Sequence, residues 1–130
     1  MPVTFDVLDE TTAGDRRGAG RFASESARTT LREIIRLRVQ QEVDRFNQSE
    51  SEVFRGLVQP EETERLLNGV RPSHRFLDLE KQLKTAIAAF QSNGFLVMVN
   101  DCQVTELDEV IELQPETQVT FLKLVPLIGG

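Results

Sequence analysis

The stretch VTFLKLVPLIGG, residues 119–130, predicts a β-strand that ends at Pro126 and leads into a short tail. Proline cannot donate a ladder hydrogen bond, so a strand seldom continues through it. Glycine loses more backbone entropy on ordering than any other residue, and a terminal Gly129-Gly130 therefore favours a flexible, extended tail. Such a tail can thread a narrow enzyme channel, and its terminal carboxylate is then the reactive group. We expect residues 126–130 to form this tail.

Three further segments upstream favour a sheet. The near-continuous apolar run FLVMV at 95–99 predicts a central strand buried on both faces. A short strand is expected at 110–113, followed by a turn at 114–117 and the last strand at 119–125. At the start of the chain, Thr4 to Leu8 alternate as in a strand.

The rest of the N-terminal region predicts a hairpin. Residues 11–20 are rich in glycine, threonine and charge, which predicts a loop or a long turn. A returning strand is expected at 21–26, with Phe22 facing inward. The helix-linked strands are expected to be parallel neighbours, since such crossovers usually join adjacent strands.

Two amphipathic helices are expected between the strands. The capping-box pattern Thr30-Leu31-Arg32-Glu33 opens the first, which should run to about Asn47. Its apolar stripe comprises Leu31, Ile35, Val39, Val43 and Phe46. The second helix should end with Gly94 as its C′ glycine. Its stripe comprises Phe76, Leu79, Leu83, Ile87 and Phe90, with Ala86.

The element order predicts one α+β domain over 1–130, with a sheet covered by helix on one face. Residues 48–75 are expected to form a helical or irregular insertion within it. A chain of 130 residues is long enough for a single core.

Composition and charge limit the classes of function that this chain could have. A net charge of −6 argues against non-specific nucleic-acid binding. The early arginines, from Arg16 to Arg38, form either a basic patch or a solvated helix face beside a loop. The sequence contains no run of 18 or more apolar residues, so no membrane span is expected. The N-terminus also lacks the pattern of a secretory signal. A single cysteine, Cys102, fits a reducing compartment, so we expect a cytoplasmic protein.

Signals for catalysis or cofactor binding are weak. Cys102 is interpreted as a passive thiol and His74 as a surface residue. No His/Cys cluster has zinc spacing, and the glycines at 14, 18 and 20 do not form a phosphate loop. We therefore expect no catalytic residue, metal or cofactor, and a protein that is not an enzyme.

Three segments carry a family resemblance: FLVMVND at 95–101, LDEVIEL at 107–113 and VTFLKLVPLIGG at 119–130. Together they resemble the C-terminal half of the ubiquitin-like β-grasp sulfur carriers. The similarity is greatest to the small subunit of molybdopterin synthase and to the thiamin-biosynthesis carrier. It covers residues 94–130 well and residues 3–47 loosely. It implies a β-grasp fold.

The resemblance also implies a function. A ubiquitin-activating-type enzyme would adenylate Gly130, with Gly129 easing access, and conjugating and deconjugating enzymes would be further partners. The extra helical insertion favours a ubiquitin-like protein modifier, of the kind found in bacterial conjugation systems, over a plain sulfur carrier. Pro126, Leu127 and Ile128 either anchor the tail in a partner groove or fold back onto the domain.

Two alternatives remain open. In one, Gly130 becomes a thiocarboxylate that supplies sulfur for cofactor biosynthesis. In the other, the chain is a non-covalent protein-binding module with an inert tail. Neither alternative involves nucleic acid or membrane.

Overall fold

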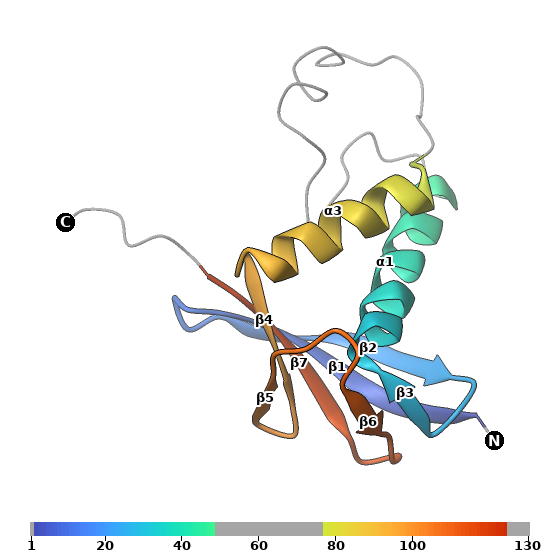
Figure 1. Ribbon diagram of the computed structural model, residues 1–130, viewed down its shortest axis with the longest axis vertical. Coiled ribbons are helices and arrows are strands. Elements are labelled where there is room, and N and C mark those ends of the chain that lie inside the picture. The colour runs from blue at the N-terminus through green and yellow to red at the C-terminus, as the bar shows by residue number, and fades with distance from the viewer. Residues whose placement is uncertain (1, 49–76, 125–130) are drawn as a thin grey trace, which may run out of the picture.

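The computed structural model describes residues 2–48 and 77–124. These residues form an α+β arrangement, which confirms the predicted class (Figure 1). The elements in chain order are β1 (Val3–Thr11), β2 (Arg16–Ser24), β3 (Arg28–Thr30), α1 (Leu31–Gln48), α3 (Leu79–Gln91), β4 (Phe95–Val99), β5 (Cys102–Val104), β6 (Val110–Glu112) and β7 (Gln118–Lys123).

The main sheet is mixed and has the strand order β2-β1-β7-β4-β5. Among the described strands, β1 and β7 form its one parallel pair, and the other neighbours are antiparallel. The expectation that the helix-linked strands are parallel neighbours is therefore wrong, because β1 and β7 lie between β2 and β4. The last strand, β7, is the central strand of this sheet, and its Val119 and Phe121 are fully buried. A second, two-stranded sheet pairs β3 with β6.

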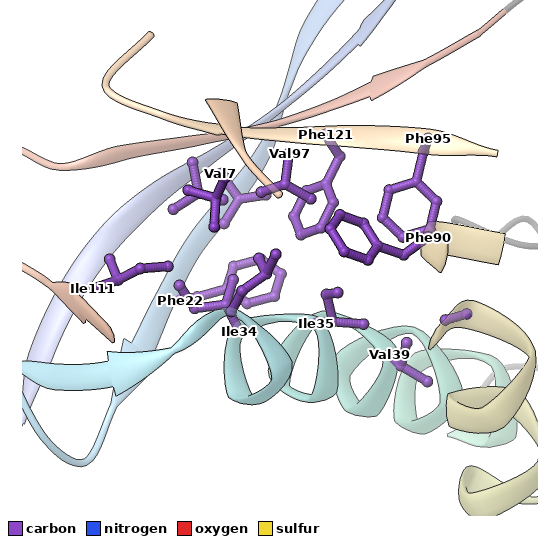
Figure 2. Close-up of a cluster of buried hydrophobic side chains, with 14 of the residues drawn as sticks. Val7, Phe22, Ile34, Ile35, Val39, Phe90, Phe95, Val97, Ile111 and Phe121 are labelled. Carbon is purple, nitrogen blue, oxygen red and sulfur yellow. The ribbon is translucent and has the colours of Figure 1, made fainter. Parts of the chain in front are cut away.

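Both described helices pack on one face of the main sheet, here called the inner face. Phe95, Val97 and Phe121 project from the sheet toward α1, which presents Ile34, Ile35 and Val39 to them (Figure 2). All five predicted stripe positions of α1 are buried, which confirms that helix. In α3, Ala86 and Phe90 are buried, whereas Leu79, Leu83 and Ile87 are half-buried, and Phe76 lies outside the described residues.

The start of α1 is capped as the sequence predicts, with help from a distant loop. The Glu33 amide donates to Thr30 Oγ1 at 3.3 Å. The Leu31 and Arg32 amides donate to the backbone carbonyls of Glu109 and Leu107 at 3.3 and 2.8 Å. A helix leaves its first N–H groups without partners inside the helix, so these bonds attach the loop before β6 to the helix start.

The end of α3 corrects one prediction. The left-handed residue is Asn93, with φ 62°, and not Gly94. The Asn93 amide donates to the Phe90 carbonyl at 3.1 Å and the Gly94 amide to the Ala89 carbonyl at 2.6 Å, which is the pattern of a Schellman motif. Gly94 is required for a different reason: a Cβ there would lie 3.1 Å from the Ala89 carbonyl oxygen.

The N-terminal hairpin corrects a second prediction. The predicted loop over 11–20 is wrong, because β2 already begins at Arg16 and the turn is confined to the residues before it. Strand pairing with β1 outweighs the low β-propensity of this glycine-rich segment. The returning strand and the inward position of Phe22 are confirmed.

The C-terminal strands agree with the sequence in most respects. The short strand β6 is confirmed, as is the turn at 114–117, closed by the Thr117 amide on the Gln114 carbonyl at 2.9 Å. In β4 only Phe95 and Val97 are buried, so the prediction of burial on both faces is wrong. The three-residue strands β3 and β5 were not predicted from the sequence pattern.

Several predictions fall outside the described residues. They are the 126–130 tail, the surface position of His74 and the insertion predicted over 48–75, of which only Gln48, the last residue of α1, is described. Among the helices at 31–48 and 79–91, none is long and apolar enough to cross a membrane.

Candidate functional site

The face of the main sheet opposite the helices, here called the open face, carries an apolar cluster. Side chains alternate along a strand, so Thr120 and Leu122 face away from the buried Val119 and Phe121. Leu8 lies beside Thr120, which lies beside Met98 of β4. In the next row, Leu122 lies beside Leu96. We call Leu8, Leu96, Met98 and Leu122 the open-face patch.

The open-face patch is accessible in the described structure. Its four side chains are half-buried, and none of them belongs to the buried core cluster or packs against it. Leu124, directly after β7, is 42% exposed. Neighbouring apolar side chains that stay partly exposed on a small domain make this surface a candidate protein-binding site. The patch thus lies on strands that include the one leading into the C-terminal residues.

A buried ion cluster lies on the other face of the same strands. The Arg38 guanidinium donates to both carboxylate oxygens of Asp9, at 2.7 and 2.9 Å, and to Glu42 at 2.7 Å. It also lies over the Phe121 ring, 5.0 Å from its centroid. Burial opposes the charged form, but the hydrogen bond to Asp9 and the charges of Glu42 and Asp9 outweigh it and raise the pKa of Arg38. Arg38 therefore links α1 to β1 and β7 as a permanent cation.

The turn between β4 and β5 fixes the start of β7. Asn100 and Asp101 have positive φ values of 50° and 71°, as a two-residue type I′ hairpin requires. The Asn100 amide donates to the Gln118 carbonyl at 2.9 Å, and its Oδ1 accepts from the Gln118 amide at 3.0 Å. The asparagine after FLVMV thus has a structural role.

The early arginines are mostly neutralised by ion pairs. Apart from Arg17, each cation of this group lies within 3.5 Å of a carboxylate oxygen: Arg16 pairs with Glu10, Arg21 with Asp6, Arg28 with Glu112, Arg32 with Asp108, Arg36 with Glu33, and Arg38 with Asp9 and Glu42. This pairing favours a solvated surface over a nucleic-acid patch.

Two polar cavities open beside these elements. One, of about 400 Å³, lies where β7 ends beside the β1–β2 turn; the Thr12 amide there donates to the Lys123 carbonyl at 3.1 Å. The other, of about 320 Å³, lies between the end of α3 and the loop after β5. Across residues 2–48 and 77–124, no group of three or more His, Cys, Asp or Glu is placed to hold a metal ion. Cys102 is exposed on β5.

The predicted site residues Pro126, Leu127, Ile128, Gly129 and Gly130 all lie outside the described residues. Sequence reasoning missed the open-face patch. The signal for this patch is the alternation of side chains along β7, together with Leu96 and Met98 of β4. Because residues 95–99 are all apolar, the sequence does not show which of them face away from the core.

Comparisons with protein-family models, with curated proteins and with solved structures gave no match.

Proposed function

We propose that this chain is a ubiquitin-like protein modifier with a β-grasp fold, whose Gly130 carboxylate is adenylated by a ubiquitin-activating-type enzyme and then joined to protein amines. The observation that supports this most is a central strand, β7, that leads toward a Gly-Gly sequence and bears an open-face patch beside it. A hairpin, a crossing helix and a mixed sheet are compatible with the β-grasp.

The chemistry needs no catalytic group on this chain. A carboxylate is a poor acylating agent, so ATP activates it: the Gly130 carboxylate attacks the α-phosphorus and pyrophosphate leaves. An enzyme thiolate then attacks the acyl adenylate and AMP leaves. A substrate amine finally attacks the thioester, releases the thiol and loses a proton as the amide forms. Gly129 and Gly130 place no Cβ beside the attacked carbonyl.

The domain's own task is to present the tail to the activating enzyme. The open-face patch offers an apolar surface for that enzyme, and the ion pairs Arg16–Glu10 and Arg21–Asp6 flank it on β1 and β2. An apolar centre with a polar rim is the usual anatomy of a protein interface.

The deciding experiment is intact-mass and immunoblot analysis of the tagged full chain isolated from its native cells. We expect a ladder of conjugates that disappears when Gly130 is deleted, while the thermal unfolding midpoint stays unchanged. Replacement of one oxygen by sulfur at the C-terminus, without a ladder, would instead identify a sulfur carrier. Neither product, with binding retained after the deletion, would identify a non-covalent module.

A pair of point variants tests whether the open-face patch takes part in conjugation. Met98→Ser should keep the fold and reduce conjugation at least about fivefold, since a hot-spot residue at the centre of an interface contributes more than about 1 kcal/mol. Val110→Ser is the matched control, because Val110 is 54% exposed and lies in the small sheet. Equal conjugation by both variants would contradict the docking role.

A further inference from the structure

The outer edge of β2 is an unpaired strand edge in the described structure. In the main sheet β2 has β1 as its one neighbour, so alternate backbone N–H and C=O groups of a nine-residue strand face away from the sheet. Such a row of unpaired groups is a template for another strand. By contrast β5, at the opposite edge, has three residues.

The backbone of β2 is unusually bare near its middle. A Cβ built on Gly18 or Gly20 would meet no atom within 4 Å. The register shift opposite Val7 and Leu8 leaves Ala19 between them without a cross-strand partner. Glycine within a strand often marks a place where another backbone approaches closely.

The positive charge of β2 indicates which kind of strand would pair with its outer edge. The strand carries three arginines and no acidic residue. Its partner β1 carries three acids in matching register: Asp6 lies opposite Arg21, Asp9 opposite Arg17 and Glu10 opposite Arg16. A second strand on the outer edge would therefore meet a strand that carries positive charge and no negative charge.

These cations differ in how fully they are occupied. Arg21 donates to Asp6, to Thr4 Oγ1 and to the Pro115 carbonyl and is therefore already engaged. The Arg16 side chain, by contrast, remains 60% exposed although it pairs with Glu10. Arg17 forms no ion pair within the described residues, because Asp9 opposite it gives both oxygens to Arg38. Among the residues that the structure describes, Arg17 is therefore the arginine of β2 that has no carboxylate partner.

We propose that the outer edge of β2 binds an extended acidic segment of a partner protein by strand addition. Backbone bonds to β2 would supply the affinity common to any strand, and carboxylates opposite Arg16 and Arg17 would supply the selectivity. This surface is separate from the open-face patch and does not depend on the proposed modifier function.

The probe for this proposal is a synthetic peptide with the sequence of β1, VTFDVLDET, titrated into the ¹⁵N-labelled full chain. We expect saturable chemical-shift changes centred on residues 16–24. A neutral peptide, VTFNVLNQT, should bind about fivefold to tenfold more weakly, since the exposed charge pairs with Arg16 and Arg17 are lost.

Two arginine variants complete the test. Arg17→Gln should weaken binding about threefold, as expected for one exposed charge pair. Arg28→Gln removes the same charge from β3, away from this edge, and should leave the affinity unchanged. Any of the following overturns the proposal: no saturable shifts, shifts centred on the open-face patch, equal binding of the two peptides, or a single-stranded oligonucleotide that binds β2 more tightly than the acidic peptide.

Discussion

The inner and open faces of the main sheet are built from the same strands but behave differently. On β7, Phe121 is fully buried beneath the helices, whereas its neighbour Leu122 is half-buried on the open face. On β4, Val97 and Met98 show the same contrast. Alternation along the strand thus separates residues that hold the domain together from residues that are available to a partner.

The contrast also has an electrostatic side. The inner face tolerates a cation, Arg38, because two carboxylates and an aromatic ring surround it. The charge pairs on the surface are exposed and solvated, so each contributes little to stability. The position of a charged side chain relative to the helices therefore decides how much it contributes to the stability of the domain.

The largest expected effect comes from Phe121→Ala. Removing a fully buried ring should lower the free energy of unfolding by about 3–5 kcal/mol, since the cavity cannot collapse completely. Leu122→Ala, one residue along and on the open face, is the matched control and should cost about 1 kcal/mol. Urea denaturation of both variants gives the comparison. Equal losses would mean that the two faces are not distinct.

The next effect comes from Arg38→Met, which leaves Asp9 and Glu42 without their buried cation. Breaking a buried pair on one side should cost about 3 kcal/mol. Because the pKa of Arg38 is raised, its charge is fully present at every pH below its usual value and is lost only above it. The loss of stability should therefore be the same at about pH 6 and about pH 9, well below the usual arginine value.

The control for that prediction is Arg36→Met. Arg36 pairs with Glu33 at 3.5 Å, with both side chains about half exposed, so its loss should change stability by less than about 0.5 kcal/mol. A loss for Arg38→Met as small as the control, or one that grows from neutral to alkaline pH, would argue against the buried cluster.

The smallest effect concerns the end of α3, which completes the cover of the inner face. Gly94→Ala should cost about 1 kcal/mol, because its Cβ would crowd the Ala89 carbonyl more than the entropic gain of about 0.4–1 kcal/mol offsets. Asn93→Gly should stabilise by up to about 1 kcal/mol, since Asn93 has the left-handed conformation that glycine adopts freely. Thermal unfolding of both variants identifies the C′ residue: if Asn93→Gly destabilised the domain, Asn93 would not have the left-handed conformation and the assignment would be wrong.

Much of the fold was predictable because local patterns agreed with the tertiary structure. The α1 stripe and β7 are strongly periodic, and the structure confirms both. The first half of β2 was not predictable, since its strand conformation comes from pairing with β1 and not from its own residues. The parallel pairing of β1 with β7 joins the two ends of the described chain, and no local signal specifies it.

The candidate site was less predictable than the fold. The sequence alone points to Gly129 and Gly130, which lie outside the described residues. The open-face patch needs the strand order, because Leu8 and Met98 are distant in sequence and are brought together only through Thr120. That Arg17 lacks a carboxylate partner within residues 2–48 and 77–124 could not be predicted either, because Asp9, which lies opposite it, is bound by Arg38 from α1.

One asparagine side chain has a consequence for engineering the chain. Asn47 accepts a bond from the Leu77 amide at 2.8 Å and donates one to the Leu77 carbonyl at 3.2 Å. These two bonds resemble the pair that neighbouring strands exchange. They join the last turn of α1 to Leu77, the residue at which the described chain resumes. Because the cost of closing a loop grows only slowly with its length, a splice point held in this way can accept sequences of very different size. A fluorescent reporter grafted between Asn47 and Leu77 would be joined to the domain at a point that the same two hydrogen bonds hold.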